Sequence, residues 1–439
     1  FNLIIKKSNI FSFKSILFYL VLITITVFLL NREKIEKILL KNISFKISNL
    51  LKTTVQISDV DFKYNGDLVI NNFNIFDHKN DTLIYVDKIT TSILTPTNIL
   101  TSNTKLSSLG LSNGIIKIIK HPGDSLTNFE VFINKVKQDN NTGNKNFSLE
   151  LKNLSLNDFR VDLVNKSNLT NQLNDFNLTV FDLKYLKSQI SLSIDNASYI
   201  DLYGLRLDDF YSKVTYSKSG FNMTDFIINS TNSKLKGSLS ISDINKMGYA
   251  DSNIEMNLLD SKISTNEINL YYNSLISDEL IEFSTSLNGS FNNTLNGRLD
   301  FQYADKTKAK INFSIEDLFG KIKVYTVLED FYTNYDDLKT LPVLKNYQIP
   351  DFLISTEFIS INGVCDYENG LISNKYVVDT DFGELILDIN LIDFLIKPKE
   401  SKFYGTVKFN EFLFKDFNLF SSTIRTSANF ILDGSISTG

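Results

Sequence analysis

Apolar residues change their spacing twice along the chain, and each spacing predicts a different kind of element. Residues 16–30 read ILFYLVLITITVFLL and are apolar almost without interruption. In residues 31–52 the apolar residues recur every three or four positions, and from Thr53 onward they recur at every second position. These spacings predict an apolar helix, an amphipathic helix and a long series of β-strands. The sequence therefore predicts a mainly β protein that begins with two helices.

The uncharged segment between Lys14 and Arg32 is a candidate membrane anchor. As a helix it would rise roughly 25 Å, close to the shortest length that crosses a hydrocarbon core about 30 Å thick. A cleaved signal peptide needs small residues after the apolar run, and NREKIEKILL supplies none at the expected place. A buried core helix would show a polar stripe, which this run lacks. We therefore expect residues 15–31 to be an uncleaved transmembrane helix whose apolar residues are Ile16, Leu17, Phe18, Leu20, Val21, Leu22, Ile23, Ile25, Val27, Phe28, Leu29 and Leu30.

Residues 32–52 predict a second helix with a single apolar stripe. The stripe consists of Ile35, Ile38, Leu39, Ile43, Ile47, Leu50 and Leu51. It either plugs the end of the following domain or lies at the membrane surface, which the neighbouring Lys and Arg residues would favour. Of these two interpretations we favour the plug.

The strand pattern begins with a predicted hairpin. An alternating segment from Val55 leads to Asn65-Gly66, a pair typical of a type I′ turn, and a second alternating segment follows. A third strand is expected at residues 82–92, after a turn at Asp77–Asp81. The alternation slips by one residue before Leu154 and again before Phe159, as it does at β-bulges. After Lys52 we expect no long helix, and residues 328–353, with two prolines, predict an irregular stretch or a short helix.

Strands that are apolar on one side must cover that side. A closed sandwich or barrel does so with its own side chains. The alternative is a long, curled, antiparallel-type sheet that stays open as a groove and binds something apolar. The pattern does not separate the two. In the groove interpretation, the alternating residues that line it include Ile311, Phe313, Ile315, Leu385, Leu387, Ile389, Leu391, Phe430 and Leu432.

Composition narrows the possible partners. The net charge of −5 and the pI of about 5.3 give no basic face, so we do not expect nucleic acid to bind. The 35 Phe and 19 Tyr, with no Trp, favour strands. The single cysteine, Cys365, excludes an internal disulfide, and its alternating context predicts a small, buried or half-buried residue.

Catalytic patterns are absent from the sequence. The only histidines, His78 and His121, each fall in a turn, where we expect exposed side chains rather than metal ligands. No metal-binding, nucleophile-elbow or P-loop spacing occurs. We therefore predict no catalytic residue, no metal site, no cofactor and no enzymatic activity.

Short motifs in the N-terminal third carry a resemblance to a known family. They are Val55, Ile57 and Val60 in the first strand, then Asp77, Asp81, Thr82 and Leu83, and later Thr231, Ser233 and Leu235. With the anchor and amphipathic helix before them, residues 15–135 resemble the TamB family of the AsmA-like superfamily, the translocation and assembly module subunits, in the form found in Bacteroidetes. Beyond residue 135 the resemblance is diffuse.

The resemblance implies an inner-membrane protein that crosses the membrane once. Residues 1–14 would be a short cytoplasmic N-terminus, 15–31 the anchor and 32–52 the amphipathic helix. Residues 53–439 would form a periplasmic β-groove, cut short at its C-terminus. Charges flank the anchor on both sides and do not decide its orientation, so the orientation also comes from the resemblance.

Two functions are implied for such a protein. One is a bridge that carries phospholipid toward the outer membrane along the apolar groove. The other is a translocation or assembly factor for secreted and outer-membrane proteins, acting with a barrel partner through a C-terminal region that is missing here. A surface β-array would require export beyond the anchor, and we do not favour it.

Overall fold

The computed structural model describes residues 40–41, 44–49, 51–63, 67–92, 103–140, 148–166, 168–186, 189–217, 219–242, 252–271, 279–340, 356–395, 400–413 and 425–435. The candidate anchor at residues 15–31 lies outside these stretches. Among the described residues, no helix combines the length and the apolar character that a membrane span requires. The chain forms two compact units, Phe1–Asn177 (unit 1) and Leu178–Gly439 (unit 2). The alternating pattern gives no sign of this division, because it falls inside a strand.

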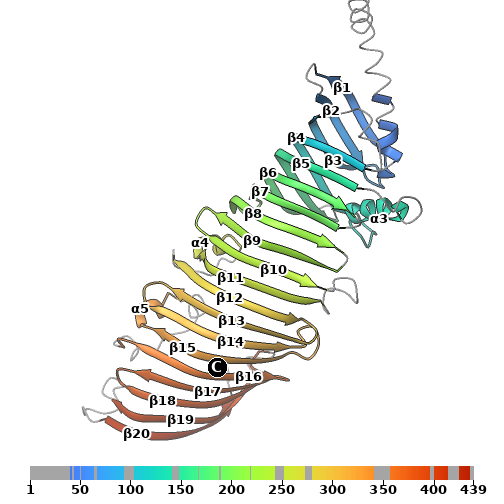
Figure 1. The fold of residues 1–439 in the computed structure, drawn as a ribbon. Coiled ribbons are helices and arrows are strands. Elements are labelled where there is room, and N and C mark those ends of the chain that lie inside the picture. Colours follow the sequence, from blue (N-terminus) through green and yellow to red (C-terminus); the bar gives the residue numbers. More distant parts are fainter. Residues whose placement is uncertain are drawn as a thin grey trace, which may run out of the picture. The chain divides into compact units, whose positions relative to one another are not determined.

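Unit 1 is a small sheet with helices. Its strands are β1 (Val55–Phe62), β2 (Asp67–Phe76), β3 (Thr82–Ser92), β4 (Asn103–Lys120), β5 (Ser148–Asn165) and the first half of β6 (Asn168–Leu186), and α3 (Asn128–Asn140) follows β4 (Figure 1). Strands β1 to β4 pair antiparallel in chain order. Phe62 is opposite Leu68, which confirms the first hairpin, although its turn at Asn65-Gly66 lies outside the described residues. The third strand has the predicted bounds.

Two expectations fail in unit 1. Strand β5 pairs with β4 in parallel, so the sheet is not antiparallel throughout. Parallel neighbours need a long crossover, and here it contains α3, a helix that the strand pattern did not predict. The missed signal is a capping box in which the Thr127 backbone N–H donates to Glu130 at 2.7 Å and the Glu130 N–H donates to the Thr127 hydroxyl at 3.2 Å.

Unit 1 has a covered hydrophobic core. It consists of Val55, Ile57, Val60, Leu68, Ile70, Phe73, Ile75, Leu83, Val86, Ile89 and Phe159. Leu40, Ile47 and Leu51 of the helical residues before β1 pack against it. The Ser44 hydroxyl donates to the carbonyl of Val55 at 2.8 Å, which ties the same segment to the edge strand β1. This packing is what the plug interpretation of residues 32–52 expects.

Unit 2 is one long sheet, and two short helices lie at the ends of its strands. Its strands after β6 are β7 (Gln189–Asp201), β8 (Arg206–Ser217), β9 (Gly220–Ser230), β10 (Lys234–Ser242), β11 (Asn253–Ser264), β12 (Leu280–Ser290), β13 (Thr294–Tyr303), β14 (Thr307–Glu316), β15 (Lys323–Thr333), β16 (Ile359–Glu368), β17 (Leu371–Thr380), β18 (Gly383–Ile392), β19 (Lys402–Leu413) and β20 (Arg425–Ser435). Helices α4 (Thr265–Asn269) and α5 (Tyr335–Leu338) follow β11 and β15. The irregular stretch expected from Leu328 thus begins only after Thr333.

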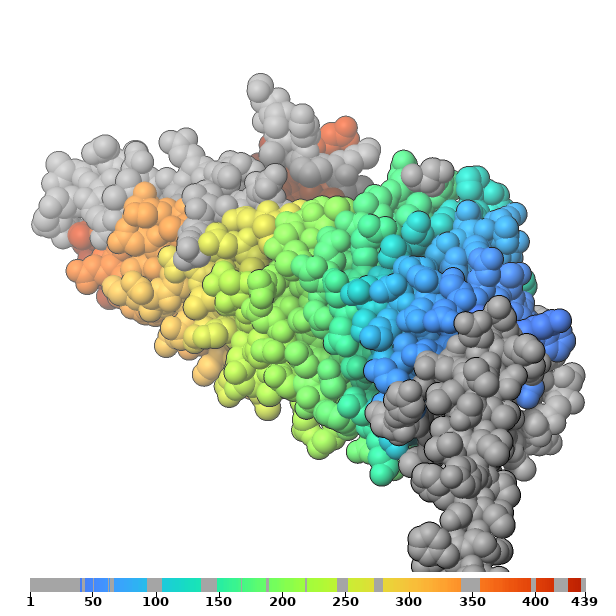
Figure 2. All heavy atoms as spheres, turned by 90° about the horizontal axis from the view of Figure 1, so that it is seen from above, coloured from blue at the N-terminus to red at the C-terminus, as the bar shows by residue number. Residues whose placement is uncertain are grey.

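The sheet of unit 2 is curled and unclosed. From β7 to β20 each strand pairs antiparallel with its neighbours in the chain. Figure 2 shows the same order as bands of colour from green through yellow to orange. All these strands belong to one sheet, and no pairing among the described residues joins β20 to an earlier strand except β19. The open, curled sheet is therefore confirmed, and a closed barrel or a two-sheet sandwich is not formed by these strands.

Bulges account for the slip before Phe159 and for two register shifts in unit 2, whereas no residue with positive φ in the described part of β5 marks the slip before Leu154. In β5 the slip before Phe159 coincides with Asp158, whose φ is +57°. In unit 2, Asp260 and Glu411 have φ values of +46° and +48° where the registers of β11 and β19 shift. Asp adopts the left-handed region more readily than most residues. Because each bulge restores the alternation, the same side of the sheet stays apolar on both sides of the slip.

Candidate functional site

The candidate site is one face of unit 2, which we call the apolar face. The register places Leu299, Ile311 and Leu328 opposite one another in β13, β14 and β15. Directly opposed residues point to the same side of a sheet. Their neighbours in the chain, such as Arg298 and Asn312, point to the other side, which we call the polar face.

All nine residues predicted to line a groove lie on the apolar face. Ile311, Phe313 and Ile315 belong to β14, and Leu385, Leu387, Ile389 and Leu391 belong to β18. Phe430 and Leu432 in β20 are joined to this face by the pairs Leu387–Val407 and Val407–Phe430. Most of the nine are half-buried, and Phe430 is 50% exposed. Some buried apolar residues of unit 2, such as Leu295 and Ile359, lie near strand ends instead.

The apolar face carries no charged side chain from β12 to β20. Following the register across these strands, its residues are aliphatic, aromatic, Gly, Ala, Thr, Cys and a single Asn. The polar face of the same strands carries Arg298, Asp300, Lys308, Lys310 and Lys375, among others. At about 4.8 Å between neighbouring strands, the sheet from β12 to β20 extends roughly 40 Å. The face is therefore a long apolar surface, not a local patch.

Glycines let aromatic rings lie flat on this face. A Cβ atom added to Gly297 would come within 2.2 Å of the Phe313 ring in the next strand. A Cβ atom on Gly363 would come within 2.4 Å of the Tyr376 ring. Each ring thus lies over a glycine of the neighbouring strand, which keeps the surface of the face smooth.

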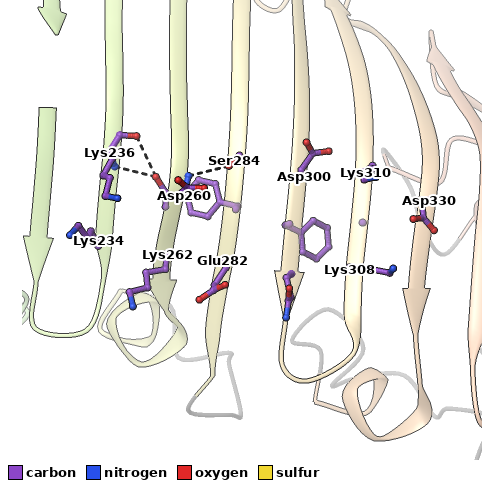
Figure 3. Close-up of a pocket in the computed structure, with 15 residues that line it drawn as sticks. Lys234, Lys236, Asp260, Lys262, Glu282, Ser284, Asp300, Lys308, Lys310 and Asp330 are labelled. Carbon is purple, nitrogen blue, oxygen red and sulfur yellow. Dashed lines mark hydrogen bonds between the residues drawn. The ribbon is translucent and has the colours of Figure 1, made fainter. Parts of the chain in front are cut away.

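The polar face has a depression of about 560 Å³. Its charged lining residues are Lys234, Lys236, Asp260, Lys262, Glu282, Asp300, Lys308, Lys310 and Asp330, and Figure 3 shows them spread over adjacent strands. Lys262 is opposite Glu282, and Lys310 is opposite both Asp300 and Asp330. Opposed charges of this kind stabilise a solvated sheet face, and they do not converge on a single point.

Helices α4 and α5 each bind a neighbouring turn at the ends of the strands of unit 2, and each does so through one acidic side chain. Glu267, the third residue of α4, accepts hydrogen bonds from the Ser230 and Ser233 hydroxyls and from the Asn232 N–H at the β9–β10 turn. Asp337, the third residue of α5, accepts the N–H groups of Lys306 and Thr307 at the β13–β14 turn, both at 2.8 Å. The two helices thus repeat one arrangement four strands apart.

The two histidines are not exposed, so that expectation is wrong. The turn between β2 and β3 meets the segment between β4 and α3, and the side chains of His78 and His121 are only 18% and 12% exposed. His78 bonds Asp124 at 2.8 Å, His121 bonds Asp77 at 2.8 Å, and the two rings are 5.5 Å apart. Two turns that are distant in sequence come together here, which sequence spacing does not reveal.

Asp77 is the centre of this cluster. One oxygen accepts the N–H groups of Lys79 and Asp81, and the other accepts His121 and the Asn128 amide at 3.0 Å. Burial opposes ionisation of Asp77, but these hydrogen bonds outweigh it and hold its pKa below the usual value. Asp77, Asp81 and His121 could offer ligand atoms to a metal ion. Because both Asp77 oxygens are already occupied, the cluster is better described as a clasp that fixes the β2–β3 turn to α3.

No protein-family model, no curated protein and no solved structure matches the chain.

Proposed function

We propose that this protein is anchored in the inner membrane and carries phospholipid toward the outer membrane along the apolar face of unit 2. The observation that carries the proposal is the uncharged, continuous apolar face, which no strand of a second sheet covers among the described residues of unit 2. The resemblance of residues 15–135 to the TamB family, and the apolar segment at residues 15–31, support the same proposal.

The energetics of lipid transfer explain what such a face would do. A phospholipid has about 30 CH₂ groups, each worth about 0.8 kcal/mol when removed from water, so exposing both acyl chains costs on the order of 20 kcal/mol. A face that covers about half of that surface removes roughly 10 kcal/mol. A barrier lowered by that amount corresponds to a rate increase of about 10⁷-fold. No catalytic group is needed for this effect.

Photo-crosslinking from paired positions tests the proposal. A photoreactive residue at Phe313 or Leu387 would lie on the apolar face, and one at Ser314 or Asp388 would lie on the polar face of the same strands. With the full chain in its membrane, we expect phospholipid adducts from the first pair and background levels from the second. Equal yields from both pairs would refute the proposal.

The same experiment separates phospholipid transport from protein assembly. A client protein captured by strand addition would bond to backbone groups at a sheet edge. Such a client would give protein adducts at edge positions and leave Phe313 and Leu387 without lipid adducts. That result would favour an assembly factor.

A further inference from the structure

The apolar face contains a small polar cluster away from the strand ends, which we call the polar island. It consists of Thr326 in β15, Cys365 in β16, and Asn374 and Tyr376 in β17. The register places Thr326 opposite Cys365, and Cys365 opposite Asn374, so three polar side chains lie in one row across three strands. On either side of this row the face is apolar, with Phe313 opposite Thr326 and Ile389 opposite Asn374.

The island is uncharged. The Tyr376 hydroxyl is hydrogen-bonded to the Cys365 thiol, and burial raises the pKa of Tyr376 to about 12. Burial also raises the pKa of Cys365. Both groups are therefore neutral at physiological pH, and the island presents hydrogen-bonding groups without charge.

Asn374 differs from the other members in its hydrogen bonding. Thr326 donates to the Cys365 carbonyl at 3.4 Å, and Cys365 bonds to Tyr376. The half-buried amide of Asn374 has no hydrogen-bond partner among the described residues, and it is the only side-chain amide on the apolar face from β12 to β20. In the absence of a ligand, water satisfies it. A hydrocarbon chain that displaced the water would leave the amide unsatisfied, which is unfavourable.

From this arrangement we propose that the polar island binds the ester groups of a diacyl lipid, with the Asn374 amide donating to an ester carbonyl. The inference rests on the proposed function, and it names the place on the apolar face where the ester groups of the lipid would bind. A phosphate would not suit the island, because an ion on an uncharged surface is costly. An ester carbonyl accepts a hydrogen bond without bringing charge, and the acyl chains attached to it would cover the apolar rows on either side.

A comparison of ester and ether lipids tests the inference. The full-length protein in detergent would be offered equal amounts of diester and diether phosphatidylglycerol with the same chain length, and bound lipid would be measured by mass spectrometry. Ether lipids lack the carbonyl. We expect wild type to prefer the ester about five-fold, as one net hydrogen bond would give. In Asn374→Leu the ratio should fall to about one while total bound lipid is unchanged.

Two controls keep the result interpretable. Asn362→Leu, at an exposed position on the polar face of β16, should keep the wild-type ratio. Asn374→Val, which places a good strand former without a hydrogen-bond donor at the same position, should lose the preference as Asn374→Leu does. Binding without an ester preference, or a preference that survives both Asn374 substitutions, would overturn the inference about the island alone. Failure to bind either lipid would overturn the proposed function, and the island's assignment with it.

Discussion

Replacing Leu387 with Asp places a carboxylate in the middle of the apolar face. Leu387 is opposite Tyr376 in β17 and Val407 in β19, and its neighbours on the same strand are Leu385 and Ile389. None of these residues carries a positive charge, and the apolar face has no cation from β12 to β20. The introduced carboxylate would therefore have no charged partner when lipid covers it.

The size of the effect follows from protonation. A carboxyl group must be protonated before hydrocarbon can cover it. For a carboxyl group with an ordinary pKa near 3.9, protonation at pH 7 costs about 4 kcal/mol. Loss of the leucine contact adds about 2 kcal/mol. Together these terms lower lipid occupancy at this position by more than about 10³-fold. At pH 5 the protonation cost falls to roughly 1.5 kcal/mol, so occupancy should recover by about 100-fold relative to pH 7.

The assay is the yield of lipid adduct from a photoreactive residue at Val407, measured at both pH values. Ile386→Asp is the matched control, because Ile386 is the preceding residue of β18, lies on the polar face and is opposite Lys408. It should leave the yield unchanged. Equal loss of adduct in the two variants would refute the prediction, and so would the same loss in Leu387→Asp at pH 5 and pH 7.

Three further predictions concern stability, each measured as the free energy of unfolding in urea. Asp77→Ala should lower the free energy of unfolding by about 3 kcal/mol at pH 7, because four hydrogen-bond donors lose the carboxylate that accepts them. The pKa of Asp77 is lowered in the folded protein, so wild type should lose this stability as the pH falls below about 4, whereas the variant should not. Gly237→Ala should cost about 3 kcal/mol, because the new Cβ meets the backbone carbonyl of Asn257. Gly297→Ala should cost only about 1 kcal/mol, because its new Cβ meets the Phe313 ring, which can move. Equal costs for the two variants would contradict this prediction. Asp337→Ala should cost about 2 kcal/mol, while Asp336→Ala, an exposed neighbour, should cost less than 1 kcal/mol.

The one-sided character of the sheet could be predicted because it is local. Alternation at every second position fixes which side chains share a face, and Leu385 to Leu391 on β18 show this without any knowledge of their partners. The slip before Phe159 was also predictable, since a bulge leaves a one-residue shift in the pattern.

Features that depend on distant parts of the chain could not be predicted in this way. The parallel pairing of β4 and β5 depends on a crossover of more than twenty residues, and only the Thr127–Glu130 capping box hinted at its helix. The contact between His78 and His121 depends on where two turns meet. The polar island shows the same limit, because Cys365 and Asn374 look unrelated until the register aligns them.

Because, among the described residues, each strand of unit 2 pairs only with its neighbours in the chain, the length of the sheet can change during evolution one hairpin at a time. Duplication or loss of one hairpin would leave the inward and outward sides of every other strand as they were, and it would alter the length by about 10 Å. The matching roles of Glu267 and Asp337 suggest a module of four strands with its own fastening. The length of the sheet could therefore change by whole modules, without redesigning any existing contact.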